Sequence, residues 1–437
     1  MFVFSAFFLP IIWRVRGPVR GGGGAARRQS GGPMDDYEVV VVDNGAGWIR
    51  AERATAEEPQ RFPNAAAKSR AEAFTRYADF SQVHDITGLA LRRPHERGYL
   101  SNADLEREIW SFVLRSRIKV DAKESGLLVT EPLVNLRACE SALEQIVFED
   151  FGFRSYYSCP APVLAAREHF EASKSDASAA GTALVVDAGF SFTHAVPVFD
   201  GRGLNYGVRR LDFGGKAATN LLKEIVSHRS MNVMSEPYVV EMMKEETCFV
   251  SMDARSDLLK AQKSRGSFAL DYVLPDGVTV LRPRVKTKED EERLLEGFKN
   301  PRHAPQVATL NHERFMVPEV FFSPSDVGLH QCGIAELAIQ ACECVDPLLR
   351  PLMLSNVLLV GGSSLIPGLP ERFRMELRKV APIDCEVNVF HSKEMACEGA
   401  WRGGKRVVNS GEYRAKCMTI REYQEHGLDP TKRRFLS

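Results

Sequence analysis

The sequence has no excess of charge of either sign and no cysteine pattern typical of a metal or disulfide site. Lys and Arg together number 57, as do Asp and Glu, so no net field draws the protein to nucleic acid or to an anionic membrane. The nine cysteines include no Cys-x-x-Cys pair, and the spacing of Cys342 and Cys344 fits neither a zinc knuckle nor a disulfide framework. No Asn-x-Ser/Thr acceptor occurs either. These absences favour a reducing compartment.

The sequence also lacks modules that read DNA and apolar runs long enough to cross a membrane. No helix-turn-helix, zinc or aromatic-basic module occurs, which argues against sequence-specific DNA binding. The N-terminal stretch MFVFSAFFLPIIW is too short to span a bilayer and has no basic residue before it, and an Arg-rich, acid-free segment follows. A leader or an organelle transit peptide fits parts of this pattern. We interpret residues 1–33 as an N-terminal extension, disordered or non-native, and expect no membrane contact.

What the chain does contain is an alternation of strand-like and helix-like segments. Its 437 residues, 44% of them hydrophobic, suffice for two to four domains. Apolar runs predict buried strands at 39–43 and 126–133, and helical spacing predicts helices at 105–114 and 143–153. The small polar segment 170–181 is the candidate boundary between two lobes. The pattern predicts an α/β protein.

One short motif occurs twice, once on each side of that boundary. VVVVDNGAG at 39–47 and ALVVDAGFS at 183–191 each consist of an apolar strand that ends in Asp, followed by a turn with Gly. The strand delivers the Asp to its end, and the Gly-rich turn lets backbone N–H groups approach an anion closely. A single turn of this kind is usually only a hairpin turn. Two copies in two lobes predict turns that face one another.

A third turn follows a strand in NVLLVGGSSLIPGLPERF, residues 356–373. It holds a glycine pair and leads into a helix whose first turn contains Pro370 and Glu371. Three such turns together favour a phosphate ester held with a metal ion in a cleft between lobes. The paired carboxylates of Asp43 and Asp187 suit Mg2+ that keeps much of its water shell.

Seven segments resemble actin in their amino-acid sequence and in their order along the chain. They are VVVVDNGAGWIRAE, VVDAGFSFTHAVPVFDG, LDFGGKAATNLL, MMKEETCFVSMD, YVLPDG, NHERFMVPEVFFSPSDVGL and VGGSSLIPGLPERF, and the resemblance covers nearly all of residues 37–437. Residues 278–310 stand where actin has a short connection, which together with GYLSNADLEREIW makes the sequence most similar to the actin-related protein 6 family. That family is nuclear and belongs to the Swr-type chromatin remodelling complex, which exchanges a Z-class histone variant into nucleosomes.

The resemblance implies a two-lobed α/β fold of the actin/hexokinase/Hsp70 ATPase type. Each lobe is expected to hold a mixed five-stranded sheet with flanking helices, and a nucleotide cleft is expected between them. The expected ranges are 34–178 for lobe 1, with 57–97 as its small subdomain and 399–437 completing it, and 179–398 for lobe 2, with a small subdomain at about 214–310 that includes the 278–310 insert.

The same resemblance implies which residues would bind ATP or ADP with Mg2+. The first phosphate turn would consist of Asp43, Asn44, Gly45, Ala46, Gly47 and Arg50, and the second of Asp187, Ala188 and Gly189. The sugar and base would contact Gly215, Lys244 and Glu245. The adenine side would be formed by Gly361 and Gly362. Asp43 and Asp187 would hold the metal through water. Without the resemblance, Lys244 and Glu245 would be an ordinary exposed helix pair, and the glycine pair an ordinary helix-end turn.

Departures from actin bear on hydrolysis. In-line attack on a γ-phosphate needs a residue that orients the water. Actin uses a Gln for this contact, and Ala161 stands at the ungapped position, flanked by Pro160 and Pro162, which make a helix there unexpected. His194 is retained at the position of a second water contact. We therefore expect nucleotide binding without efficient hydrolysis, and no catalytic residue.

Three further replacements fall within the expected site. Phe190 replaces an Asp in the second turn, Arg50 replaces a Lys in the first, and Ile366 replaces a Tyr near the base. An aromatic ring beside a phosphate turn offers no hydrogen bond, so we expect Phe190 to narrow the site.

The remaining alternatives concern assembly. Residues 57–82 replace the loop by which actin subunits meet lengthwise, and they are polar and Ala-rich, so we expect no self-polymerisation. The alternative is an ATP-hydrolysing cytoskeletal filament protein. The insert carries a basic strip, Arg282, Arg284, Lys286 and Lys288, which is either a solvated charged face or a surface for a partner. The resemblance favours a nuclear scaffold that contacts subunits of the remodelling complex, and nucleosomal histones through them, and so regulates transcription.

Overall fold

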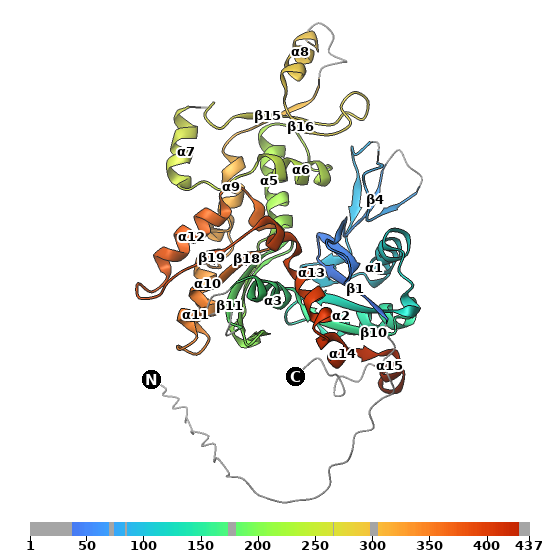
Figure 1. Ribbon diagram of the computed structural model, residues 1–437. Coiled ribbons are helices and arrows are strands. Elements are labelled where there is room, and N and C mark those ends of the chain that lie inside the picture. Colours follow the sequence, from blue (N-terminus) through green and yellow to red (C-terminus); the bar gives the residue numbers. More distant parts are fainter. Residues whose placement is uncertain are drawn as a thin grey trace, which may run out of the picture. The chain divides into compact units, whose positions relative to one another are not determined.

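Two mixed sheets, each with helices on both faces, make up most of the structure (Figure 1). This computed structural model describes residues 37–69, 74–83, 85–173, 181–264, 266–297 and 305–427. The expected extension at 1–33 and most of the expected linker at 170–181 lie outside these residues. The α/β fold with two mixed sheets is confirmed, whereas the exact lobe boundaries stay predictions.

The first sheet contains the first of the two repeated motifs. Its strands, in spatial order, are β20 (Met418–Thr419), β10 (Ser155–Pro160), β9 (Ser125–Glu131), β1 (Glu38–Asn44), β2 (Trp48–Arg53) and β3 (Gln60–Pro63). β1, β9 and β10 run parallel to one another, and the other pairs are antiparallel. Parallel neighbours place the ends of β1 and β9 at the same edge of the sheet, so Asp43 and Thr130 lie close together.

Strand β1 is buried on both faces, which explains its unbroken run of valines. Val40 and Val42 pack into one hydrophobic cluster with Ile109 of α1. Val39 and Val41 face the other way, where Val41 packs in a second cluster with Trp401, whose Nε1 donates a hydrogen bond to Val41 O at 3.1 Å. Because side chains alternate along a strand, one short segment contributes to two cores.

The second sheet contains the other copy of the motif. Its strands are β13 (Arg202–Gly203), β12 (Thr193–Phe199), β11 (Ala183–Ala188), β18 (Val357–Val360) and β19 (Val389–Phe390), with β14 (Arg209–Leu211) paired to β12. Each sheet thus has six strands, one more than the expected five. The difference comes from edge strands of two or three residues, which are too short to form a hydrophobic run in the sequence.

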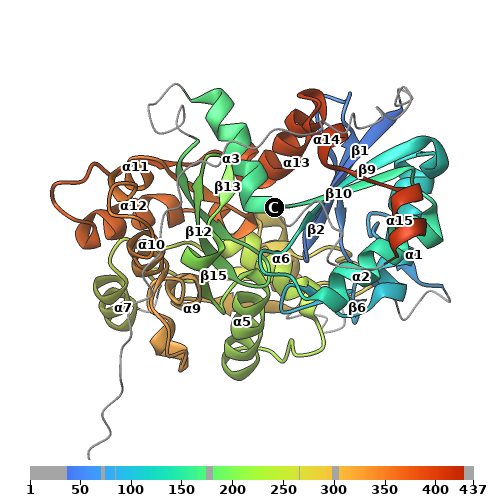
Figure 2. The same ribbon diagram turned by 90° about the horizontal axis from the view of Figure 1, so that it is seen from below.

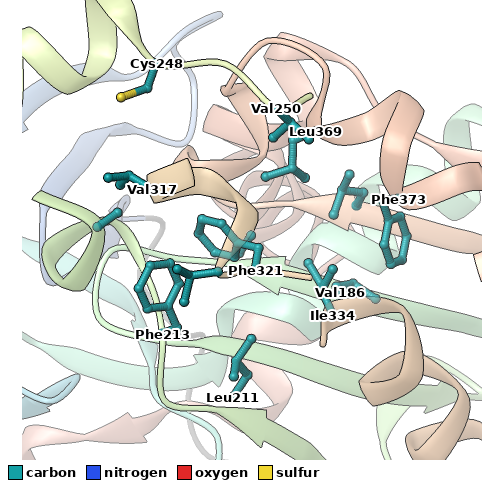
Figure 3. Close-up of a cluster of buried hydrophobic side chains, with 14 of the residues drawn as sticks. Val186, Leu211, Phe213, Cys248, Val250, Val317, Phe321, Ile334, Leu369 and Phe373 are labelled. Atoms are coloured by element: carbon teal, nitrogen blue, oxygen red, sulfur yellow. The ribbon is translucent and has the colours of Figure 1, made fainter. Parts of the chain in front are cut away.

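Strand β11 alternates in the same way as β1. Leu184 and Val186 enter the largest core cluster, and Val185 faces a smaller cluster with Val360. Figure 3 shows Val186 in the larger cluster, with Phe213, Phe321 and Phe373 near it. The ring centroids of Phe213 and Phe321 are 4.9 Å apart in an edge-to-face arrangement.

Two helices lie side by side between the sheets, α3 (Ala161–Ala172) and α13 (Lys393–Asn409) (Figures 1 and 2). A Cβ on Gly403 would lie 1.9 Å from Leu164 O, so only glycine permits this close approach. The expectation that prolines prevent a helix at Ala161 is wrong. Pro160 is the N-cap residue and Pro162 lies in the first turn, where no intrahelical N–H bond is lost.

The other elements flank the sheets. Their bounds are α1 (Ala103–Trp110), α2 (Arg137–Gln145), α5 (Gly215–Arg229), α6 (Pro237–Thr247), α7 (Ala254–Lys263), α8 (Lys288–Gly297), α9 (Glu313–Glu319), α10 (Ile334–Glu343), α11 (Arg350–Leu354), α12 (Leu369–Val380), α14 (Glu412–Lys416) and α15 (Ile420–His426), with π-helices at Ser111–Ile118 and Ile146–Phe151 and short 3-10 turns at Ala122–Glu124, Asn205–Gly207, Pro324–Val327 and Gly362–Leu365. Small sheets are formed by β4 (Ala66–Lys68), β5 (Arg76–Tyr77) and β6 (Ala90–Arg92), by β7 (His95–Glu96) and β8 (Tyr99–Leu100), and by β15 (Leu270–Val273), β16 (Arg284–Val285) and β17 (Val307–Leu310). No helix in the described part of the chain is long and apolar enough to cross a membrane.

The described residues between 65 and 89 include hydrophobic side chains that pack against elements following the second motif. Phe80, Ile86 and Leu89 are buried in the same cluster as Val240, and the Phe80 and Tyr238 rings meet edge to face at 5.8 Å. Within 57–82, the segment that stands in place of the actin loop, Ala65, Ala67 and Phe80 are therefore buried inside this chain.

The basic strip of the insert is also largely used internally. Arg282 donates to Val83 O at 2.9 Å, Arg284 pairs with Asp290 at 2.7 Å, and Lys286 pairs with Asp271 at 2.5 Å. Only Lys288, of the four strip residues, is classed as exposed. The strip is not an open cationic surface, because three of its charges bind groups of the same chain. Residues 298–304 of the insert lie outside the described residues.

Candidate functional site

A cavity of about 430 Å³ lies between the two repeated turns, a size typical of small-ligand sites. Its walls contain nearly all the residues expected from the sequence: Asp43, Asn44, Gly45, Ala46, Gly47, Arg50, Asp187, Gly189, Gly215, Lys244, Glu245, Gly361 and Gly362. Phe190, His194, Ala161 and Ile366 also line it. Ala188 does not, because its side chain is buried in the largest core cluster.

The two turns meet at Gly47 and Phe190. A Cβ on Gly47 would lie 2.9 Å from the Phe190 ring, so the glycine is needed for this approach. Arg93 joins the same contact, since its Nη1 donates to Gly47 O at 3.0 Å and its guanidinium carbon lies 4.4 Å from the centroid of the Phe190 ring. Its Nη2 pairs with Glu241 of α6 at 3.0 Å. Phe190 therefore links the turns.

Polar side chains hold the first turn. Thr130 Oγ1 donates to Asp43 Oδ1 at 2.9 Å and accepts from the backbone N–H of Asn44 at 2.7 Å. Arg50 Nη1 lies 3.1 Å from Asp43 Oδ2, and Asn64 Nδ2 donates to Gly45 O at 3.1 Å. Both oxygens of Asp43 and one carbonyl of the turn are thus fixed by neighbouring strands and loops.

Backbone bonds hold the second turn. Gly189 N donates to Phe192 O at 3.0 Å, Gly215 N to Gly189 O at 3.1 Å and Lys216 N to Phe190 O at 2.8 Å. The hydroxyl of Ser363 adds a bond to Gly189 O at 2.9 Å. This turn is therefore attached to the first residues of α5 and to the glycine-pair turn after β18.

The glycine pair itself contains two different environments. Gly361 has φ 89° and ψ 151°, a conformation almost confined to glycine, and a Cβ there would lie 2.4 Å from both Ala188 O and Asp187 Oδ1. A Cβ on Gly362 would meet nothing within 4 Å. Gly361 is thus required by the backbone, and Gly362 leaves open space at the cavity wall.

Comparison with known proteins identifies the family. The family model described as Actin matches residues 34–436. The chain belongs to the actin family. Curated relatives named Actin-related protein 6 are 39% identical in Oryza sativa subsp. indica, 38% in Arabidopsis thaliana and 35% in Drosophila melanogaster. Each alignment covers 91% of this chain and 98% or 99% of the relative, which places the chain in the actin-related protein 6 group of that family.

The carboxylates of this actin-family cleft fit a solvated divalent cation. Burial and, to a smaller extent, the neighbouring charge of Asp43 raise the pKa of Asp187 to about 6, whereas Arg50 opposes the shift. A cation between the two carboxylates would relieve this repulsion. No cluster of three or more His, Cys, Asp or Glu able to hold a metal occurs among the described residues. The pair therefore suits Mg2+ held mainly by water and phosphate oxygens.

Lys244 and Glu245 of α6 differ in exposure, because Glu245 is exposed whereas Lys244 is not. Lys244 is buried, and its Nζ donates to Gly215 O at 3.1 Å and to Thr219 Oγ1 at 2.9 Å. Partial desolvation nevertheless raises the pKa of Glu245. The lysine joins α6 to the first turn of α5, so it positions Gly215 at the cavity wall.

His194 and Ala161 are poorly suited to orient a water molecule for attack on phosphate. The pKa of His194 is lowered to about 4, chiefly by burial and then by Arg210, and its ring lies 4.2 Å from that of Phe192. The imidazole is therefore neutral near pH 7. Ala161 presents a methyl group where a polar side chain would be needed.

Sequence reasoning missed four residues that support the turns: Arg93, Thr130, Asn64 and Glu106. Thr130 carried a usable signal, because it directly follows the apolar run at 127–129 as Asp43 directly follows the valines of its own strand. Arg93 and Asn64 lie in loops with no motif around them, and Glu106 lies in the segment GYLSNADLEREIW, which marks the family but assigns no role to this residue. Only tertiary structure brings them to the site.

Proposed function

We propose that this chain is a non-polymerising nuclear actin-related protein that serves as a structural subunit of a Swr-type chromatin remodelling complex. Through that complex it would take part in exchange of a Z-class histone variant into nucleosomes and in the regulation of transcription. Similarity to proteins named Actin-related protein 6 along nearly the whole chain supports this proposal. Imaging the tagged protein in cells tests the expected nuclear location, and exclusion from the nucleus would contradict it.

The cavity between the turns would hold ATP or ADP as a structural ligand. The backbone of the two turns would receive the phosphates, Arg50 would add positive charge, and Lys244 would keep Gly215 in place. Bound Mg2+ would neutralise phosphate and carboxylate charge. A ligand that binds only the folded state adds about 3 kcal/mol of stability at a hundredfold excess over Kd. Analysis of nucleotide released from the native purified protein tests occupancy, and its absence, together with no thermal shift on adding Mg-ATP, would exclude this role.

We infer that hydrolysis is inefficient, because no polar group stands at Ala161 and His194 is neutral and packed against Phe192. The measurement is steady-state phosphate release, with Asp187→Ala as the blank. Turnover equal to that of the blank is expected. Turnover clearly above it would favour the alternative of an active ATPase.

The burial of Ala65, Ala67 and Phe80, which belong to the segment 57–82, supports the absence of filaments, because these side chains are not free to bind a second subunit. Sedimentation in Mg2+ and salt distinguishes the alternatives. The protein is expected to stay in the supernatant at all concentrations, and a pellet with a critical concentration would revive the filament alternative.

The insert is the proposed surface for other subunits, but the exposed charged groups of its described part are mainly acidic. Glu289 and Glu292 on α8 are exposed, whereas three basic residues before them are paired. We expect Glu289→Lys with Glu292→Lys to reduce co-purification with the remodelling complex. Glu224→Lys on α5 combined with Glu371→Lys on α12, both at exposed positions, is the charge-matched control. Equal recovery of both proteins would exclude this face of the insert as the contact.

A further inference from the structure

Behind the first turn lies a closed polar cluster that does not line the cavity. Glu106 of α1 is fully buried, and its Oε1 accepts from Asn44 Nδ2 at 2.6 Å. Trp110 Nε1 donates to the other side of the same amide, Asn44 Oδ1, at 3.3 Å. Asn44 belongs to the first turn, so a single hydrogen bond links the side chain of Glu106 to a residue of the turn that would receive phosphate.

Asn64 completes the cluster from the connection between β3 and β4. It is fully buried, and its Nδ2 donates to Gly45 O at 3.1 Å, while its side chain also meets Glu106. Rotating the amide by half a turn would place an oxygen against Gly45 O, so the observed orientation is the one that the turn requires. Asn64 thus binds the turn with its NH2 group.

Two buried oxygens in this cluster have no hydrogen-bond partner, Glu106 Oε2 and Asn64 Oδ1. If Glu106 were ionised, both atoms would be acceptors with no donor, which is costly in the interior. A proton on Glu106 Oε2 turns that oxygen into a donor, and the Asn64 side chain, which interacts with Glu106, carries the unpaired acceptor Oδ1.

The groups around Glu106 offer no charge to hold a carboxylate. Asn44 of β1, Asn64 and Trp110 are neutral, and burial raises the pKa of Glu106 to about 7 even with these hydrogen bonds. The titratable neighbour in the cluster is His95 of β7, which meets Asn64 at 3.4 Å. Burial lowers the pKa of His95 to about 4, so it is neutral above pH 5.

We propose that Glu106 is a positioning residue that acts as a neutral carboxylic acid. Its Oε2–H donates to Asn64 Oδ1 while its Oε1 accepts from Asn44 Nδ2, so one side chain holds two residues that fix the first turn. Loss of the proton removes the donor and places a negative charge behind the turn. The binding of anionic phosphate then weakens as pH rises. This consequence rests on the proposed nucleotide site, whereas the protonation state of Glu106 does not.

The test compares wild type with Glu106→Gln between pH 5.5 and 8.5. A glutamine amide can donate to Asn64 and accept from Asn44 at every pH, so it imitates the neutral acid. Exposed Glu108→Gln on the same helix is the matched control. In thermal unfolding without nucleotide, the Tm of wild type minus that of Glu106→Gln is expected to fall as pH rises toward 7, because the folded state keeps a proton that the unfolded state releases. Glu108→Gln is expected to follow wild type.

The second readout is the affinity for Mg-ATP. With a pKa of about 7, the neutral form at pH 8 is roughly one molecule in ten, so wild-type affinity relative to Glu106→Gln is expected to fall about tenfold between pH 6 and pH 8. The ratio to the variant removes effects of Asp187 and the histidines, which both proteins share. Infrared absorption of a protonated carboxyl at pH 6.5, present in wild type and lost in Glu106→Gln, is the direct measurement.

The outcomes separate the two proposals. If the unfolding difference depends on pH as expected but no nucleotide binds, the neutral Glu106 stands and the nucleotide role fails. If nucleotide binds with the same pH dependence in both proteins and the Tm difference is constant, Glu106 is ionised and the inference is overturned. Should Glu106→Gln not fold, absence of the protonated-carboxyl band from wild type at pH 6.5 would overturn it equally.

Discussion

The first and second turns share a strand, an Asp and a Gly-rich turn, but they are held in different ways. Around the first turn most of the supporting atoms belong to side chains: Thr130 and Arg50 fix Asp43, and Asn64 fixes Gly45. Around the second, most are backbone atoms, with bonds from Gly189, Gly215 and Lys216. The rings of Phe190 and Phe192 add aromatic contacts to this turn, Phe190 with Arg93 and Phe192 with His194.

Because of this difference, the conformation of the first turn depends on protonation, and that of the second on the volume of its side chains. Side-chain bonds can be changed by a single proton, as at Glu106, without altering the chain path. Backbone bonds and aromatic contacts respond instead to volume and to φ. The first turn should therefore be sensitive to pH in the neutral range, and the second to substitutions that add or remove atoms.

The largest expected effect is steric and falls on the support of the second turn. Gly361→Ala places a Cβ 2.4 Å from Ala188 O and Asp187 Oδ1 in a conformation that alanine rarely adopts, so we expect a loss of about 3 kcal/mol or more in the free energy of unfolding. Gly362→Ala, where a Cβ meets nothing within 4 Å, should change it by about 0.5 kcal/mol or less. Urea unfolding measures both. Equal effects of the two substitutions would show that the backbone at Gly361 can relax.

The second largest expected effect is on the pH dependence of stability at His194. It has the opposite sign to the effect expected for Glu106, because stability falls as pH falls. Burial lowers the pKa of His194 to about 4 in the folded protein, from an ordinary value of 6.5. The neutral buried imidazole therefore contributes to the free energy of unfolding above pH 6.5. This contribution, up to about 3 kcal/mol, is lost as pH falls toward 4. We expect His194→Gln to lose less stability than wild type between pH 7 and pH 4.5 in urea unfolding. His95 titrates in the same direction, so the variant keeps part of the slope.

The control for this prediction is His330→Gln, because His330 is exposed. It should follow wild type throughout the acid range. An unchanged slope in His194→Gln would mean that the buried imidazole is protonated or that another group dominates the acid loss.

The smallest effect concerns the contact between the turns. Phe190→Ala removes the ring against Gly47 and its cation–π contact with Arg93, at an expected cost of about 1 to 2 kcal/mol. Phe190→Leu keeps part of the volume but not the cation–π contact, so it should cost less than Phe190→Ala. Urea unfolding at pH 7 gives both values. If neither variant is destabilised, Phe190 does not join the turns in solution.

The sequence by itself determined the two sheets and the position of the cavity. Valine-rich runs ending in Asp43 and Asp187 each had to be strands buried on both faces, because no other short structure hides four consecutive apolar side chains and leaves a carboxylate at its end. Gly361 followed from its pattern too, since a strand that turns sharply at a glycine pair needs a backbone open to positive φ. These are local properties, and the sequence carries them locally.

Tertiary structure alone decided how the turns are supported and what the replaced residues do. Phe190 was expected to narrow a phosphate site, yet its partner Arg93 lies 97 positions earlier in the chain and brings it to Gly47. The basic strip was a candidate partner surface, but its charges meet Val83, Asp290 and Asp271. Glu106 became notable only when Asn44 and Asn64 closed around it in the interior. Such roles depend on which distant groups share a buried space, and no local pattern of residues specifies that.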